Sequence, residues 1–372
     1  MNRSLVILSI IISITFFFSG IYIASYEIFP YNILKNLKND YLDTQSSNLI
    51  YYEDNVESLL NVNNKSSVDK LREKLNLFLW DDNSLPKSLP DNIEFDIKDS
   101  RYSDLENLDS IDKLTVTMEP DVKSYSYLFK PLKSNNKLIL YHQGHSGDFF
   151  NGKNTIQFFL ENEYSVLAFS MPLLGLNNQP IIDHPQFGKI KLTSHDQLKF
   201  LETDNFTPIG LFLKPPIISL NYIQENHSFD SFNMVGLSGG GWTTMMISAI
   251  DARIDQSFSI AGSYPIFLRT EVRNFGDYEQ TDPKLYEIAN YLDLYTIASY
   301  GENRKFIQIF NKFDPCCFDG DSYLAYENVV KNNVLNLKNG YFDIYLDDTH
   351  KQHKISEYAL GIIINSIENE EI

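Results

Sequence analysis

Short apolar runs recur along the chain from about residue 112 onward, separated by longer segments of mixed composition. Several runs are almost continuously apolar, which is typical of strands buried on both faces of a sheet. The separating segments are long enough for crossover helices, and three of them have helical spacing. The predicted strands are "KLILYH", "YSVLAFSMP", "FNMVGL", "SFSIAG", "KFIQIF" and "YFDIYL". The predicted helices are "TIQFFLENE", "TTMMISAIDARI" and "ISEYALGIIINSI".

The beginning of this region has a different pattern. In "KLTVTMEPDVKSYSYLFKP" apolar and polar residues alternate on both sides of a Pro-Asp turn, which predicts an antiparallel hairpin. The whole region therefore predicts an α/β fold, with a mostly parallel central sheet flanked by helices and a hairpin at its start. Two long segments, 175–208 and 264–302, follow predicted strand ends; we interpret both as insertions, the second of them lid-like.

The N-terminal region contains an uncharged stretch, "LVILSIIISITFFFSGIYIA", over residues 5–24. Twenty such residues are enough to span a bilayer as a helix. A cleaved signal peptide has a shorter apolar core and ends in a small-x-small site, whereas Tyr22 and Ile23 stand near the end here. We therefore expect an uncleaved signal-anchor, a single-pass transmembrane helix that carries an exported catalytic domain in the periplasm or outside the cell.

The segment between this anchor and the α/β region is polar. It contains one amphipathic stretch, "SVDKLREKLNLFLW", which two prolines in "SLPKSLPDN" terminate. We interpret it as a polar stalk with one packing helix. The expected organisation is an anchor over 1–29, the stalk over 30–111 and the α/β domain over 112–372.

Composition narrows the range of partners. Of the 372 residues, 43% are apolar and 22% are charged, as in a globular protein, and the formal net charge is -18. A nucleic-acid-binding protein needs a basic face, so no nucleic-acid partner is expected. The two cysteines, Cys316 and Cys317, are adjacent and cannot join distant segments. We interpret them as small buried apolar residues.

A candidate nucleophile stands in "FNMVGLSGGGWTTMM". Gly236, Ser238 and Gly240 form a G-x-S-x-G motif directly after a predicted strand and before a predicted helix, as a nucleophile elbow requires. Side chains at Gly236 or Gly240 would collide with the neighbouring strand and helix. A plain glycine-rich turn is the weaker interpretation, and a phosphate-binding loop is weaker still because no Gly-Lys-Ser/Thr follows.

A serine hydroxyl needs a base and an orienting acid, which on such an elbow follow in the order serine, acid, histidine. His350 and His353 are the two histidines after Ser238, and both lie between the last predicted strand and the last predicted helix. We favour His353, which lies three residues before a predicted N-cap at Ser356, and keep His350 as the alternative base.

The acid is expected after the preceding strand, in "KFIQIFNKFDPCCFDGD". This segment offers Asp314, Asp319 and Asp321. Asp314 is favoured because it follows the apolar run by four residues, in a turn that Pro315 makes rigid.

The oxyanion of a tetrahedral intermediate needs backbone N–H donors. We expect one from Gly239, directly after the nucleophile, and a second from His145, in the loop "HQGHSGDFF". His142 and His145 alone do not make a zinc site, since no cysteine or glutamate lies near them in the chain. We expect no metal and no cofactor.

These parts, "GLSGGGW", "HQGH", "NKFD" and "HKIS", resemble the α/β-hydrolase superfamily over residues 112–372. The resemblance is greatest to its esterase, dienelactone-hydrolase-like and acetyl-esterase-like branches. One departure is Gln143, which separates His142 from Gly144 where many members have His and Gly adjacent.

The resemblance implies a serine hydrolase that cleaves acetyl or short acyl esters of small molecules or glycans through an acyl-enzyme, and the uncharged N-terminal stretch predicts that this hydrolase is membrane-anchored. The alternatives are a serine peptidase of the prolyl-oligopeptidase-like type and a non-catalytic binding protein with the hydrolase fold.

Overall fold

The computed structural model describes residues 12–20, 22–23 and 55–369. The chain divides into two compact units, 1–52 and 53–372. In the first unit residues 12–20 are helical, and most of the predicted anchor lies outside the described residues. Among the residues that the structure describes, no helix is both long and apolar enough to cross a membrane.

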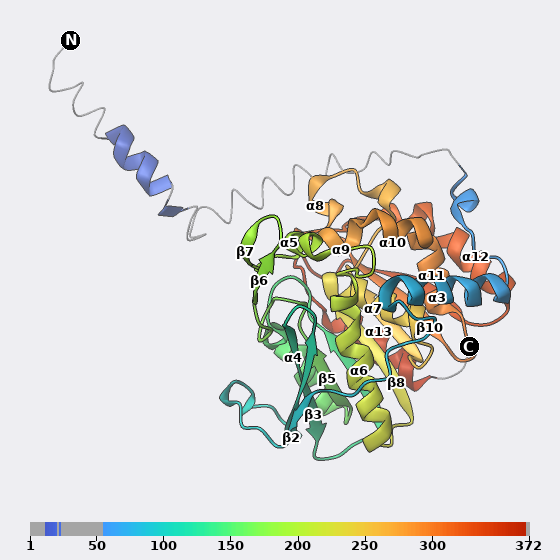
Figure 1. Ribbon diagram of the computed structural model, residues 1–372, viewed down its shortest axis with the longest axis horizontal. Helices are drawn as coiled ribbons and strands as arrows, with labels where there is room; N and C mark the ends of the chain where they lie inside the picture. The colour runs from blue at the N-terminus through green and yellow to red at the C-terminus, as the bar shows by residue number, and fades with distance from the viewer. Residues whose placement is uncertain (1–11, 21, 24–54, 370–372) are drawn as a thin grey trace, which may run out of the picture. The chain divides into compact units, whose positions relative to one another are not determined.

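A nine-stranded sheet forms the centre of the second unit (Figure 1), in the order β1-β2-β3-β5-β4-β8-β9-β10-β11. Strands β5, β4, β8, β9, β10 and β11 run parallel, whereas β1, β2 and β3 pair antiparallel. The predicted α/β fold with a mostly parallel sheet and an initial hairpin is therefore confirmed. The strands are β1 (Asn92–Glu94), β2 (Leu108–Met118), β3 (Val122–Pro131), β4 (Lys137–His142), β5 (Ser165–Phe169), β8 (Ser231–Leu237), β9 (Gln256–Ile260), β10 (Lys305–Asn311) and β11 (Tyr341–Asp347).

Both faces of this sheet are covered by helices. Alternate residues of β4 show the division: Leu138 and Leu140 join one apolar cluster, while Ile139 and Tyr141 join the other. The first cluster includes side chains of α3, α6, α7, α11 and α12, and the second includes side chains of α4 and α13. These helices are α3 (Lys65–Trp80), α4 (Lys153–Glu161), α6 (Gly210–Asn226), α7 (Gly239–Ile250), α11 (Tyr291–Ser299), α12 (Glu327–Leu337) and α13 (Glu357–Glu368).

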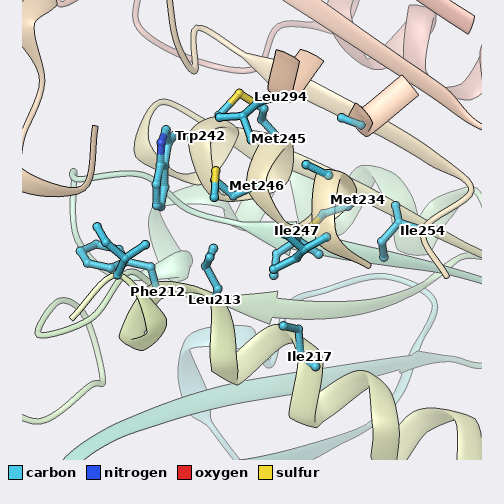
Figure 2. Packing of buried hydrophobic residues seen from close by; sticks show 14 of the residues in the cluster. Phe212, Leu213, Ile217, Met234, Trp242, Met245, Met246, Ile247, Ile254 and Leu294 are labelled. Carbon is cyan, nitrogen blue, oxygen red and sulfur yellow. The ribbon is translucent and has the colours of Figure 1, made fainter. Parts of the chain in front are cut away.

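Helix α7, which follows the candidate nucleophile, lies deep in the molecule. All twelve of its residues are buried. Figure 2 shows Trp242, Met246 and Ile247 of α7 beside Phe212 and Leu213 of α6. A helix that is buried on all sides has no solvent face, so this packing holds α7 in place.

The predicted packing helix is present as α3. Its N-terminus has a capping box, in which the Asn64 side chain accepts from the Ser67 N–H and Ser67 in turn accepts from the Asn64 N–H. The Arg72 side chain donates to the carbonyl oxygens of Ala249 at 2.9 Å and Ile297 at 3.0 Å. Because β1 also pairs with β2, the described part of the predicted stalk belongs to the same compact unit as the sheet.

The two predicted insertions contain regular structure that the sequence pattern does not predict. The first holds a two-stranded hairpin and a short helix: β6 (Ile181–His184), β7 (Gly188–Lys191) and α5 (His195–Leu198). The second holds, before α11, three short helices: α8 (Val272–Phe275), α9 (Tyr278–Thr281) and α10 (Pro283–Ile288).

Candidate active site

The parallel register places four functional loops at one edge of the sheet. His142 at the end of β4 pairs with Gly236 of β8, and Leu237 pairs with Ile260 at the end of β9. At the other side Asn311, the last residue of β10, pairs with Asp347, the last residue of β11. The chain therefore leaves β4, β8, β10 and β11 at the same edge, where ligand sites of open α/β sheets form.

Ser238 occupies a sharp turn between β8 and α7. Its backbone has φ 58° and ψ −126°, a region that costs a non-glycine residue about 1–3 kcal/mol. The turn is held on both sides, because the Ser238 N–H donates to Ile260 O at 2.8 Å and Ser238 O accepts from the Trp242 N–H at 3.0 Å. Ser238 is 8% exposed. This strained strand-to-helix turn is the geometry of a nucleophile elbow.

The flanking glycines leave no room for side chains. A Cβ atom at Gly236 would lie 2.1 Å from Gly240 O, at the start of the helix. A Cβ atom at Gly240 would lie 2.1 Å from His142 O, at the end of the neighbouring strand. Both contacts are with backbone atoms, so no side-chain movement could relieve them. The close approach of strand, turn and helix therefore requires glycine at both positions.

Asp314 and His353 form a hydrogen-bonded pair beside this edge. His353 Nδ1 lies 2.7 Å from Asp314 Oδ2, and the carboxylate also accepts from Asn311 Nδ2 at 3.0 Å and the Cys316 N–H at 2.8 Å. Asp314 is 2% exposed, so these donors replace the water that its charge would need. A proton on Nδ1, donated to Asp314, leaves the lone pair of the His353 ring on Nε2.

The surroundings of His353 also change its proton affinity. Burial lowers the pKa of His353, but the hydrogen bond and the negative charge of Asp314 outweigh burial, and the net pKa lies above its usual value. Asp314 thus stabilises the imidazolium form that a general base must pass through.

The alternative base, His350, has both ring nitrogens in use. Its Nε2 lies 3.1 Å from Asp347 Oδ2, and its Nδ1 accepts the Gln352 N–H at 3.0 Å. Neither nitrogen is left to take a proton from a serine. The geometry therefore favours His353 over His350.

The two other candidate acids lie apart from His353. Asp319 forms an ion pair with Arg273 at 2.9 Å, and Asp321 is exposed. Of the three aspartates in this segment, Asp314 is the one that contacts His353.

The loop after β4 packs directly on the elbow. A Cβ atom at Gly144 would lie 2.7 Å from Ser238 Cβ and 3.2 Å from Gly239 N. The His145 ring lies against Gly239. Gln143 links both ends of this loop through its side chain. The side chain accepts a hydrogen bond from the Tyr141 hydroxyl and donates one to Ser146 Oγ at 2.5 Å. The two predicted oxyanion donors, Gly239 and His145, are thus brought together.

Beside them, His142 is fully buried, and burial lowers its pKa to about 4. His142 is therefore a neutral side chain under ordinary conditions.

The adjacent cysteines lie close to the candidate serine and the candidate histidine. The sulfur atoms of Cys316 and Cys317 and a ring nitrogen of His353 all lie within 4.8 Å of one another. The Cys317 thiol also interacts with the Ser238 side chain. Cys317 is buried as expected, but Cys316 is exposed, so the prediction of two buried residues was wrong for Cys316. The turn that presents Asp314 to His353 leaves Cys316 exposed, and no pattern in the sequence indicates this position.

A second group of side chains close to the elbow could hold a metal ion. His145, His195, Asp277 and Glu279 present ligand atoms that all lie within 4.8 Å of one another. Three of these residues come from the two insertions, and sequence reasoning missed them because nothing in their spacing along the chain connects them. Burial lowers the pKa of His145, but the hydrogen bond and charge of Glu279, together with the charge of Asp277, outweigh burial and raise the net pKa above its usual value.

A large cavity lies elsewhere. It measures about 770 Å³ and is lined by residues of the C-terminal end of α3, the 202–207 loop and the start of α6, with Met118 and Lys284. None of the predicted site residues lines it. The chemistry is therefore located by the elbow and its partners and not by the size of a hollow.

Comparison with solved structures gives the same fold. Acetyl xylan esterase 1 from Thermoanaerobacterium sp. JW/SL YS485 is 13% identical with a TM-score of 0.55, over 85% of this chain and 98% of that one. The chain therefore shares the α/β fold of this esterase. The acetyl xylan esterase from Paenibacillus sp. R4 is 13% identical with a TM-score of 0.55, over 84% and 97% of the two chains.

A glucuronoyl esterase from Solibacter usitatus is similar at 11% identity and a TM-score of 0.52, over 82% of this chain and 92% of that one. No protein-family model matches the sequence, and no curated protein matches it significantly. At identities as low as these, the structural similarity establishes the fold only. The activity therefore has to be argued from the site.

Proposed function

We propose that the protein is a serine esterase in which Ser238, His353 and Asp314 form a catalytic triad. The observation that carries the proposal is that a strained elbow serine stands at the same edge of the sheet as a histidine that a buried carboxylate orients at 2.7 Å. Ser238 follows β8, Asp314 follows β10 and His353 follows β11. The chain order is therefore serine, acid, histidine, as a nucleophile elbow of this kind requires.

The proposed reaction begins when His353 Nε2 takes the proton of the Ser238 hydroxyl. The serine Oγ then attacks the ester carbonyl, and the backbone N–H groups of Gly239 and His145 stabilise the oxyanion. His353 returns the proton to the leaving alcohol, so an acyl-enzyme and a free alcohol form. Water, activated by the same histidine, then releases the acid. The charge of Asp314 stabilises the imidazolium in both halves of the reaction.

The proposed substrate is an acetyl or short acyl ester of a small molecule or a glycan. Two solved structures with the same fold are acetyl xylan esterases, which supports an acetylated glycan as the substrate class. The net charge of -18 agrees with a neutral substrate better than with a polyanion such as a nucleic acid.

Membrane attachment remains part of the proposal. The uncharged residues 5–24 support an N-terminal anchor with the catalytic unit exported. Fractionation of cells that express the full chain, compared with a chain that starts at residue 30, tests it. Recovery of the full chain in the soluble fraction would contradict the anchor without affecting the proposed chemistry.

The test of the activity is turnover of a series of p-nitrophenyl esters from acetate to decanoate by a chain spanning residues 30–372. We expect the highest kcat/KM with acetate or another short acyl group, and a loss of at least about 10⁴-fold in the Ser238→Ala variant. Equal turnover by wild type and variant would contradict the mechanism. Cleavage of peptide anilides in preference to esters would instead indicate the peptidase alternative.

A further inference from the structure

Four side chains from three separate segments meet beside the elbow. His145 comes from the loop after β4, and His195 is the first residue of α5 in the first insertion. Asp277 precedes α9 in the second insertion, and Glu279 lies within α9. Both insertions contact His145, and the loop that carries His145 packs on Ser238. The four side chains are therefore next to the candidate active site.

The distances within this group suit a small cation. His145 Nε2 lies 3.0 Å from Glu279 Oε1 and 3.2 Å from Asp277 Oδ2. His195 Nδ1 lies 3.6 Å from both Glu279 Oε2 and Asp277 Oδ2. A tetrahedral ion with metal–ligand bonds of about 2.0–2.1 Å places its ligand atoms about 3.3 Å apart. The four groups are therefore already close to the spacing of a ligand set.

The hydrogen bonding of His195 points to a cation in the space between them. His195 Nε2 lies 2.9 Å from Pro172 O, and since a carbonyl oxygen can only accept, Nε2 carries a proton. In the neutral ring Nδ1 is then a lone pair that faces two carboxylates. Within the described part of the chain, neither His195 Nδ1 nor Glu279 Oε2 has a hydrogen-bond partner. Acceptors that face one another in a buried place need a positive charge between them.

Burial makes this need stronger. The side chain of Glu279 is 0% exposed and that of His195 is 2% exposed, so water cannot compensate the charge of the carboxylate. A histidine that ligates a metal usually donates its other ring N–H to a carbonyl or carboxylate oxygen, as His195 does to Pro172 O.

We propose that His145, His195, Asp277 and Glu279 bind one divalent transition-metal ion, for which zinc is the best fit. Two imidazole nitrogens and two carboxylate oxygens are ligands that zinc accepts in tetrahedral geometry. The sequence offers His142 and His145 no third ligand nearby, which is why it predicts no metal. The fold supplies the ligands from the two insertions, and His142 takes no part.

The ion has a structural role, because four protein ligands leave no open position for substrate. It fastens both insertions to the loop that carries Gly144 and His145. Where the esterase proposal holds, the ion also positions the loop whose His145 N–H is the proposed second donor to the oxyanion. The binding of the metal itself does not depend on that activity.

The test uses the chain spanning residues 30–372, free of affinity-tag histidines, stripped with a chelator and dialysed. Zinc is then titrated by calorimetry and counted by elemental analysis, and thermal unfolding is followed with and without it. We expect one zinc per chain and a rise in Tm when zinc binds. Because changes to groups that only support ligands cost about 10–100-fold in affinity, we expect Asp277→Asn and His195→Asn to weaken zinc binding by more than about 100-fold.

The controls separate this proposal from others. Asp183→Asn and His184→Asn alter the first insertion, which also carries His195, at exposed or half-exposed positions outside the cluster and should bind zinc as wild type does. Asp277 is 51% exposed, so its variant should fold and still fail to bind. Ser238→Ala should keep its zinc, which distinguishes a failed esterase proposal from a failed metal site. Absence of zinc, cobalt, nickel and manganese binding in wild type, or equal zinc affinity in Asp277→Asn and Asp183→Asn, would overturn the proposal and assign the cluster to protonated histidines.

Discussion

His353 Nδ1 lies 2.7 Å from Asp314 Oδ2, and this contact fixes which nitrogen of the ring can act as a base. The carboxylate is held in turn by Asn311 and by the Cys316 N–H. A pre-oriented imidazole of this kind lowers the cost of forming the charged intermediate.

The choice between the two late histidines can be tested with matched variants. We predict that His353→Asn loses at least about 10⁴-fold in kcat, because no other group takes the serine proton. His350→Asn should stay within about tenfold of wild type, since His350 contacts Asp347 and the Gln352 N–H and supports the loop only. Steady-state kinetics with p-nitrophenyl acetate on both variants checks this. The reverse pattern would make His350 the base.

The pH profile should report the raised pKa of His353. The neutral ring is the active base, so kcat/KM should fall as the pH drops through the pKa of His353. This pKa lies above the usual histidine value of about 6.5. In Asp314→Asn the carboxylate that raises the pKa is gone and burial dominates, so the pKa should drop below that value. Kinetics between pH 5 and 9, with NMR titration of the His353 ring in the variant, measure both. An unchanged pKa in Asp314→Asn would contradict the assigned partner.

Cys316 offers a chemical probe of the site. The hydrogen bond with Cys317 lowers the pKa of the Cys316 thiol, and the nearby His353 adds to this effect, whereas the pKa of Cys317 is raised. Cys316 is exposed and Cys317 buried. Iodoacetamide should therefore alkylate Cys316 first and block ester turnover by crowding His353.

The matched control for this probe is Cys316→Ser. Treated with iodoacetamide, the variant should keep the turnover of its untreated form, while treated wild type loses most of its own. Equal inactivation of the two, or alkylation of Cys317 first as mapped by mass spectrometry, would contradict the geometry.

The glycine of the oxyanion loop should matter for activity more than an equivalent change elsewhere. A Cβ atom at Gly144 would lie 2.5 Å from Leu237 O and would push the loop off the elbow. A displacement of about 1 Å at a reacting group can cost about 100-fold, so Gly144→Ala should lose at least that in kcat/KM. At Gly361 in α13 nothing lies within 4 Å, so Gly361→Ala should keep full activity and gain about 0.5–1 kcal/mol of stability. Equal activity of the two variants would contradict the role of the loop.

The sequence predicted the parts whose signal is local. The six parallel strands and the hairpin were predictable because burial on both faces and alternation leave their marks within a few residues. The elbow turn and the loops that carry Asp314 and His353 were predictable because each of them follows such a strand. Helix α6 was not predictable from the sequence, because it contains Pro215 and Pro216 and prolines usually mark the end of a helix.

The proposed metal-binding group could not be predicted for a different reason. His195 follows His145 by 50 positions, and Glu279 follows His195 by 84. His195 and Glu279 also lie in insertions whose apolar residues show little regular spacing. Only the packing of both insertions against the loop after β4 brings them together. The same holds for Cys316, whose nearness to His353 depends on the turn around Asp314 and not on spacing.

The most direct test of the central claim is covalent labelling of the purified protein with a fluorophosphonate, followed by mass spectrometry of the digested peptides. A serine activated by His353 and Asp314 should gain one adduct at Ser238 within minutes at pH 8, and His353→Asn should gain none on that timescale. Failure of the folded wild-type protein to label at Ser238, while a known serine hydrolase labels in the same tube, would contradict the account.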